Sequence, residues 1–471
     1  MLYSLEEIKK LEEKMVQLGP RLTGSKAHNE FISIIKEEIK KIGLVPKSDV
    51  LMMKKRWEPK RWKLSILEDG VELEIPDVTY YPYSGETPPE GITGKMLYCG
   101  RNNIGSFLGS NDKIALVEMS IFEAGVGLVF KKRSTFPEEY MPPRKLASPV
   151  VSSFINAPMI WRAKMMGAKG VICIMRGCSD ENAAYQYLPF ITSYKGIPAL
   201  WVNSTQGKIL RDAEKRGAEV NLTLEAITEE NVPTENVYAI LKGKNDKETI
   251  MINTHTDGTN AFEENGPVAI LSLMRYFASI PIEFRERTLV FSFVTGHFQL
   301  PQFGSPANQA TNRFLRKHKE LWSGKNRKAV AGLSIEHLGC TEWRDSKDKT
   351  KYEKVSEIDP ELVFVANKEL DKVYLDACKE RKHAKVLTLK PKNLLYFGEG
   401  QPMYIVGIPT ISIVPGPDYL CTNSPTGYLE KINYNLMEEQ IDTCKKVVER
   451  LDKMSAQEIG RSEIFTYGFN F

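Results

Sequence analysis

Seven side chains that can bind a metal ion or transfer a proton follow apolar segments in the second half of the chain. They are His255, Asp257, Glu263, Glu264, His297, Glu336 and His337. Imidazole nitrogens and carboxylate oxygens are common zinc ligands, and a ligand histidine needs its second nitrogen held by an acceptor that fixes its tautomer. A His-x-Asp sequence contains both groups within one turn. We therefore predict that His255 binds a metal ion and that Asp257 orients it.

The apolar segments before these residues are typical of buried strands. Segments 249–253, 287–294, 329–336 and 409–414 are rich in Val, Ile, Leu and Phe. Segment 287–294 is nearly continuously apolar after its first residues, as expected of a strand covered on both faces. Helical segments alternate with these strands, beginning with residues 266–280. This alternation predicts an αβα sheet, in which ligands bind at the carboxyl ends of the strands.

The first half of the chain predicts an N-terminal part of the same unit and a separate insert. The first 45 residues favour two helices, separated by the turn-forming sequence GPRLTGS at residues 19–25. Short β-rich runs then alternate with loops between residues 90 and 230, with one helix at 158–166. We therefore divide the chain into an N-terminal part at residues 1–75, an insert at 90–230 and a main unit at 235–471.

Composition excludes several classes of function. The chain has 471 residues, with 64 Lys and Arg against 60 Asp and Glu, and a net charge of +4 is too small for a general nucleic-acid binder. The sequence has no run of about 18 apolar residues that would cross a membrane, and its charged N-terminus does not resemble a signal peptide. Seven scattered cysteines fit free thiols in a reducing compartment. We expect a cytoplasmic protein with neither a nucleic-acid nor a membrane partner.

The order of the motifs resembles that of the co-catalytic zinc aminopeptidases, which include aminopeptidase Y, secreted bacterial leucine aminopeptidases and glutamate carboxypeptidase. The GPRLTGS sequence is similar to the opening motif of that family. Residues 287–291 (RTLVF) resemble the strand that leads to the catalytic glutamates, and residues 407–409 (GIP) resemble a strand near the end. The resemblance covers nearly the whole chain. It implies an α/β fold, an αβα sandwich of the zinc aminopeptidase type, with a β-rich protease-associated domain inserted at 90–230.

The resemblance also assigns roles to single residues of one metal site. His255 falls on the first ligand histidine and Asp257 on its supporting aspartate. Glu263 falls on the carboxylate that bridges the two metals, which is normally an aspartate. Glu336 falls where an aspartate usually completes the shell of the same metal. His255, Glu263 and Glu336 are therefore the ligands that the resemblance implies.

The second metal site of that family has lost two ligands. The consecutive glutamates, which act as general base and ligand, fall on His297 and Phe298. The terminal ligand histidine would fall near Thr422 or Asn423, and the sequence has no histidine after His383. One ion is therefore expected rather than two. Zinc is the choice that the resemblance favours, and manganese or iron would also suit one histidine and two glutamates.

A one-metal site of this kind can hydrolyse amides or esters. A water molecule activated by the metal would attack the carbonyl carbon, with His297 as the base, although His297 is equally open as a fourth ligand. The ion or His337 would polarise the carbonyl.

Other residues have roles that the sequence leaves less defined. The sequence leaves two roles open, contact with the substrate or support of the metal ligands, for Glu264, His337, Glu399 and Asp418. The resemblance also implies a cis peptide bond between Glu263 and Glu264. The remaining histidines, His28, His318 and His383, have charged neighbours and are expected at the surface.

These inferences give two hypotheses for function. The first is a zinc-dependent hydrolase, aminopeptidase-like or amidohydrolase-like, that acts on a peptide or small amide. The second is a catalytically inactive binding or regulatory protein on a peptidase fold, which the loss of the glutamate pair favours. Substrate identity and oligomeric state, including a homodimer, stay open.

Overall fold

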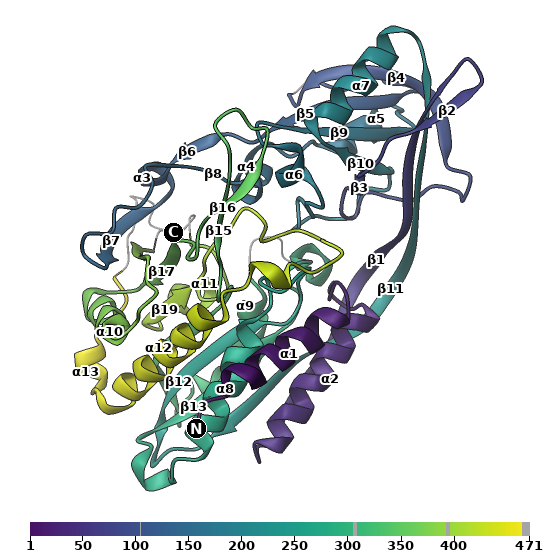
Figure 1. Cartoon of the computed structure of the whole chain (residues 1–471). Helices are drawn as coiled ribbons and strands as arrows, with labels where there is room; N and C mark the ends of the chain where they lie inside the picture. The colour runs from purple at the N-terminus through teal and green to yellow at the C-terminus, as the bar shows by residue number, and fades with distance from the viewer. Residues whose placement is uncertain (104, 305–308, 392–395, 464–471) are drawn as a thin grey trace.

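The computed structural model describes residues 1–103, 105–304, 309–391 and 396–463, and its elements are shown in Figure 1. Four parallel strands form the centre of the main sheet. In spatial order they are β13 (Arg287–Val294), β12 (Asn245–His255), β14 (Lys328–Ile335) and β19 (Thr410–Ile413). Beyond β19 the sheet continues through β17 (Glu361–Val365), β18 (Val386–Lys390) and β7 (Lys131–Phe136).

The central strands are buried on both faces. Every residue of β13 is buried, and on β12 the side chains of Ile250 and Ile252 lie in one apolar core while Met251 lies in another. Successive strand residues point to opposite faces, so one nearly continuous apolar run contributes to both cores. The predicted α/β sandwich is confirmed, and the strand expected at 287–294 has the expected bounds.

Helices cover both faces of this sheet. One face carries α1 (Leu5–Gln17), α2 (Lys26–Lys41), α8 (Gly266–Ala278), α10 (Lys368–Cys378), α12 (Tyr434–Lys453) and α13 (Ala456–Ile459). The other face carries α9 (Ala310–Lys317) and α11 (Gln401–Ile405). Polar caps set where the long helices begin: Ser4 forms a capping box with Glu7, and Asn433 accepts the backbone N–H of Leu436 at 3.0 Å.

The predicted insert contains a smaller sheet. Its strands from the insert are β4 (Ile92–Arg101), β5 (Ile114–Ser120), β9 (Gly170–Arg176) and β10 (Ala199–Val202), which are parallel. Strand β3 (Thr79–Tyr80), which precedes the insert, pairs antiparallel with β10. Helices α5 (Ile160–Met165), α6 (Asp180–Ala183) and α7 (Ser204–Lys215) accompany them.

A long antiparallel ribbon joins the two sheets. It consists of β1 (Lys47–Glu68) and β11 (Glu219–Leu241), with the short strand β2 (Val71–Glu74) beside β1. One end of β11 pairs with β4 and the other end pairs with β13. The strand therefore runs without interruption through residues 230–235, where the sequence suggested the start of the main unit (Figure 1).

A segment of the insert returns to the main sheet. We name residues 121–157 the crossing segment; it contains β6 (Glu123–Gly125), α3 (Val126–Val129), β7, β8 (Lys145–Ala147) and α4 (Pro149–Asn156). Strand β7 pairs with β18 and so becomes the edge of the main sheet. The remaining elements are short: β15 (Glu342–Asp345), β16 (Tyr352–Ser356), η1 (Ile282–Phe284), η2 (Leu300–Phe303), η3 (Lys319–Leu321) and η4 (Leu429–Lys431).

Two expectations about exposure are wrong. His28 is fully buried, with its Nε2 2.9 Å from the hydroxyl of Thr256, and His318 is buried with its Nε2 2.5 Å from a carboxylate oxygen of Asp49. The charged residues beside these histidines lie on the outer faces of their helices, so neighbours in sequence do not report the environment of the ring. Among the described residues no helix is long and apolar enough to cross a membrane.

Candidate metal centre

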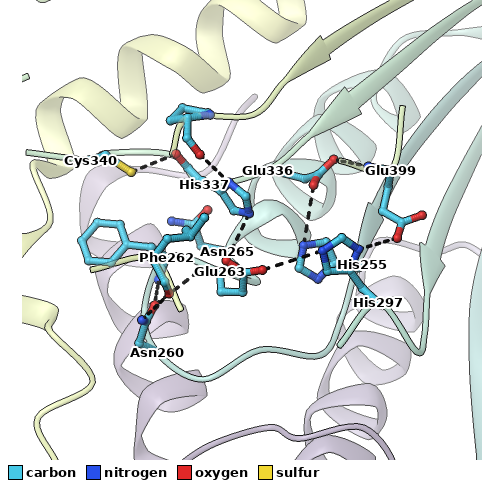
Figure 2. Close-up of polar contacts among 12 residues, drawn as sticks. His255, Asn260, Phe262, Glu263, Asn265, His297, Glu336, His337, Cys340 and Glu399 are labelled. Atoms are coloured by element: carbon cyan, nitrogen blue, oxygen red, sulfur yellow. Dashed lines mark hydrogen bonds and ion pairs between the residues drawn. The ribbon is translucent and has the colours of Figure 1, made fainter. Parts of the chain in front are cut away.

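Loops after three adjacent strands bring the predicted ligands together (Figure 2). His255 ends β12, His297 follows β13, and Glu336 with His337 follows β14. Parallel strands place their carboxyl ends at one edge of the sheet, so these loops meet there. Two groups of donor atoms lie close enough to hold a metal ion, with all atoms of each group within 4.8 Å of one another: His255, Glu336 and His337, and His255, Glu263 and His297.

His255 is held as a neutral ring with one free nitrogen. Its Nδ1 lies 3.0 Å from the backbone carbonyl oxygen of Asp257 and donates to it, which leaves the lone pair on Nε2. Burial, together with the nearby His297, lowers the pKa of His255 to about 3. A neutral imidazole with an outward lone pair is the form that binds a metal ion.

His337 is held in the same way. Its Nδ1 lies 2.7 Å from the carbonyl oxygen of Pro415 and donates to it, so Nε2 again carries the lone pair. Burial lowers the pKa of His337 well below its usual value. The sequence suggested His337 as a group that polarises the carbonyl, contacts substrate or supports the ligands, and not as a metal ligand. Its φ of 57° turns the chain sharply after Glu336.

The two glutamates each direct one oxygen at these nitrogens. Glu336 Oε1 accepts hydrogen bonds from the Ser334 hydroxyl at 2.9 Å and the Glu399 backbone N–H at 2.8 Å, while its Oε2 lies 3.8 Å from His255 Nε2. Glu263 Oε2 lies 3.4 Å from His337 Nε2. Burial raises the pKa of Glu336 to about 7 and that of Glu263 well above its usual value.

Four buried donor atoms of this cluster lack a hydrogen-bond partner among the described residues. They are His255 Nε2, His337 Nε2, Glu336 Oε2 and Glu263 Oε2. Each unpaired buried polar atom costs about 1–3 kcal/mol, and a native protein keeps such groups together only where something else satisfies them. Two imidazoles and a carboxylate are a zinc set, and a second carboxylate can expand the shell. The residues present therefore fit a divalent metal ion.

The two groups of donors overlap at one residue. Both groups of donors contain His255, whose only free lone pair is on Nε2 because Nδ1 is bonded to Asp257. One lone pair binds one ion, so His255 Nε2 can serve only one of the two groups at a time.

His297 lies beside this position and is tied to an acid. Its ring stacks on His255 with 4.2 Å between centroids, and its Nδ1 lies 2.6 Å from Glu399 Oε1. Its Nε2 faces Glu263 Oε1 at 3.8 Å. Burial alone lowers the pKa of His297, but the hydrogen bond and charge of Glu399 outweigh it and raise the pKa to about 9. His297 is thus placed to carry a proton on the nitrogen that faces the ligands.

Glu399 connects several parts of the site. Besides His297, its carboxylate accepts the backbone N–H groups of Ala310 at 3.1 Å and Thr311 at 2.7 Å, and its own N–H binds Glu336. Burial opposes ionisation, but the hydrogen bond and charge of His297 outweigh it, with help from the Thr311 N–H, and lower the pKa of Glu399 to about 2. The preceding Gly398 has φ +81°, and a Cβ there would lie 2.8 Å from Glu336 Oε1. The sequence Gly-Glu-Gly thus matches a tight turn behind a ligand.

Asp257 acts on the loop after β13 rather than on the ring of His255. Its carboxylate accepts the backbone N–H groups of Gly296, His297 and Phe298 at 3.1, 3.2 and 2.9 Å. The hydroxyl of Thr23, within the GPRLTGS sequence, donates to it at 2.5 Å. The backbone carbonyl of Asp257 provides the orientation of His255 that we expected from this residue. The carboxylate of Asp257 positions His297 instead.

Glu264 belongs to neither group of donors. Its carboxylate pairs with the buried Arg21, also in the GPRLTGS sequence. Burial raises the pKa of Glu264 to about 7 in spite of this partner. The expected cis bond between Glu263 and Glu264 is absent, because the cis bonds of the described residues precede Pro137 and Pro189.

Asp418 also lies outside the cluster. Its carboxylate is 3.8 Å from Arg344, which also binds Asp359 at 3.1 Å. Burial raises the pKa values of Asp418 and Asp359 to about 7, against the opposing charge of Arg344.

The raised pKa of Asp418 predicts a dependence of stability on pH. Its carboxyl stays protonated up to about pH 7 in the folded chain but ionises near pH 3.8 when unfolded, so the folded state binds more protons between these values. The free energy of unfolding therefore falls as the pH rises from about 4 to 7. Asp418→Asn should make this fall shallower by up to about 1.4 kcal/mol per pH unit. Urea unfolding at pH 5, 6 and 7 measures it, with the exposed Asp348→Asn as control; parallel profiles for wild type and Asp418→Asn would contradict it.

Three of the donor residues, Glu263, Glu336 and His337, line one apolar cavity of about 140 Å³. His297 lines it too, and most of the remaining lining residues are apolar. A cavity with a few convergent polar groups is typical of a small-molecule site.

Comparison with known proteins addresses the fold. No protein-family model and no curated protein matches the sequence. A zinc aminopeptidase from Bacillus subtilis aligns with a TM-score of 0.62 at 16% identity, over 97% of this chain and 98% of that one. An M28 peptidase precursor from Shewanella amazonensis gives 0.64 at 15% identity, over 96% and 98%. An aminopeptidase from Aneurinibacillus sp. strain AM-1 gives 0.58 at 15% identity, over 94% and 93%.

These alignments cover nearly the whole of each chain, insert included. Identities of 15–16% show the fold and not the activity. Together with the strand order and the two helical layers described above, they show that the chain has the fold of the zinc aminopeptidases and M28 peptidases.

Proposed function

We propose that the protein is a metal-dependent hydrolase that cleaves an amide bond in a peptide or small amide through one divalent ion, zinc by preference. The observation that carries this proposal is the convergence of four buried, unpartnered donor atoms on one position beside a cavity. His255, Glu336 and Glu263 would hold the ion, as the sequence indicated, with His337 as a further donor. The aminopeptidase and peptidase structures with the same fold support the reaction class.

The residues around the ion have separate tasks. When bound, the ion supplies Lewis-acid polarisation of the substrate carbonyl and lowers the pKa of a water molecule. His297 Nε2 holds the proton that the leaving amine needs, and after releasing it can accept one from water. Glu399 keeps the ring in place through Nδ1, and Asp257 holds the backbone on which the ring stands.

One observation favours a non-catalytic protein that binds a ligand at the same site. Phe298 occupies the place of a glutamate that binds a metal ion in the resemblance, and it is fully buried, 5.0 Å from Phe190 and 5.7 Å from Tyr187 between ring centroids. An apolar ring there cannot bind a metal ion. Under this second hypothesis the metal site remains but turnover is absent.

Metal content measured beside hydrolysis separates the two. Protein purified without added metal or chelator is analysed by elemental mass spectrometry, with Glu336→Ala beside wild type, and is assayed on amino-acid amides and dipeptides. About one ion per chain, lost in the variant, with hydrolysis that a chelator abolishes and zinc restores, supports the hydrolase. One ion without turnover on any substrate favours the binding protein, and no ion after zinc is supplied contradicts both.

A further inference from the structure

The crossing segment is fastened to the main unit by a strand pairing, by polar contacts and by a buried ring. Strand β7 pairs with β18 from Lys131 to Phe136. The hydroxyl of Ser134 donates to Asp371 at 2.7 Å, and Arg133 pairs with Glu463 at 2.7 Å. Phe130 is buried in the core of the main unit, with its ring 5.8 Å from Phe397. The segment is therefore an integral wall and not a loosely attached loop.

This segment forms more than a third of the cavity wall. Nine of the residues that line the cavity come from it: Phe122, Ala124, Val126, Phe130, Leu146, Ser148, Val150, Val151 and Phe154. Eight of these are apolar, and the main unit adds Leu362, Phe397 and Val414 opposite them. The four polar residues of the donor cluster lie in the same wall, so a group in the cavity is adjacent to the metal position.

The size of the cavity limits what it can hold. A volume of about 140 Å³ is close to the roughly 150 Å³ of an apolar cavity that binds benzene in another protein. A water molecule finds few hydrogen-bond partners in an apolar wall, and an unpaired charge there would lose its hydration without compensation. We propose that the crossing segment selects a substrate that carries one uncharged, benzene-sized apolar group next to the bond that is cleaved. This inference rests on the proposed function, because only a hydrolase has a substrate to select. The binding of such a group can be tested without turnover.

Two residues give this proposal a sharp test. Ala124 lies on the short strand β6 and has a small side chain in the cavity wall. A larger side chain at this position would therefore fill the cavity. Phe154 is 48% exposed, and its ring packs edge-on against Phe190 at 5.5 Å, so a charge there changes the rim without emptying a core. Its neighbour Ile155 is 67% exposed and does not line the cavity, which makes it a matched control.

The experiment measures binding of 4-fluorobenzyl alcohol, an uncharged benzene-sized probe, by fluorine NMR titration of the full chain with zinc and after chelation. Wild type and Ile155→Asp should bind with affinities within twofold of each other. Ala124→Trp and Phe154→Asp should each bind at least tenfold more weakly.

Failure of this inference is distinct from failure of the proposed function. The inference is overturned if wild type shows no saturable binding, or if Phe154→Asp and Ile155→Asp bind equally well. It stands if the probe binds as expected, even where no amide is hydrolysed, and in that case the proposed reaction alone is refuted. Circular dichroism checks that Ala124→Trp is folded, and Phe154→Asp decides the matter if it is not.

Discussion

His255→Ala is expected to bind less than one tenth of the zinc that wild type binds, and to lose hydrolytic activity with it. The substitution removes the one nitrogen that belongs to both groups of donors, so no alternative shell remains. Mutation of a supporting residue alone typically costs 10–100-fold in metal affinity, and loss of the shared ligand should cost at least as much. Elemental mass spectrometry after dialysis against metal-free buffer gives the zinc content of each variant.

Two other histidines make this result specific. His383→Ala removes a ring that pairs with Glu439 on the outer side of the main unit, and it should retain about as much zinc as wild type. His337→Ala tests the donor that sequence reasoning did not include, and it should also lose most of the zinc. Equal zinc in His255→Ala and His383→Ala would refute the metal position described here, whereas full zinc in His337→Ala would restore the three-ligand set of His255, Glu263 and Glu336.

His297→Ala is expected to keep its zinc and to lower kcat by about 10²–10⁴-fold. The zinc should remain because the four donors of His255, Glu263, Glu336 and His337 are still present. The rate should fall because the ring supplies a proton at Nε2, and general acid–base groups contribute rate factors of that size. Steady-state kinetics on the best amide from the panel, with zinc content measured on the same preparation, tests both parts.

His318→Ala is the matched control for this variant. His318 is also a buried histidine paired with a carboxylate, but its partner Asp49 lies on β1, away from the donor cluster. It should leave kcat within a few-fold of wild type. If His297→Ala loses its zinc as well, His297 is a ligand of the ion. An unchanged kcat with full zinc would remove it from the reaction altogether.

Several features of the site were predictable because they depend on local sequence. The four apolar runs report strands buried on both faces, and residues that follow such strands collect at one sheet edge whatever the rest of the chain does. This is why His255, His297 and Glu336 could be placed near one another without a structure. The histidine and carboxylate types were enough to indicate a metal ion.

Other features depend on contacts between residues far apart in sequence. Glu399 meets His297 across 102 positions and Thr23 meets Asp257 across 234, and no periodicity encodes such pairs. The tautomer of His337 depends on the carbonyl of Pro415, which reaches it only because β14 and β19 are neighbours in the sheet.

The sequence by itself therefore determined the α/β class, the edge of the sheet at which chemistry is placed, and the kinds of ligand available there. Only the tertiary structure decided that His337 joins the donors, that Asp418 does not, and that residues 121–157 cross over to line the cavity. The physical reason is that burial patterns depend on neighbours one to four residues apart, which the sequence displays directly. Hydrogen-bond partners, pKa values and cavity walls depend on distances in space, which only the packed chain establishes.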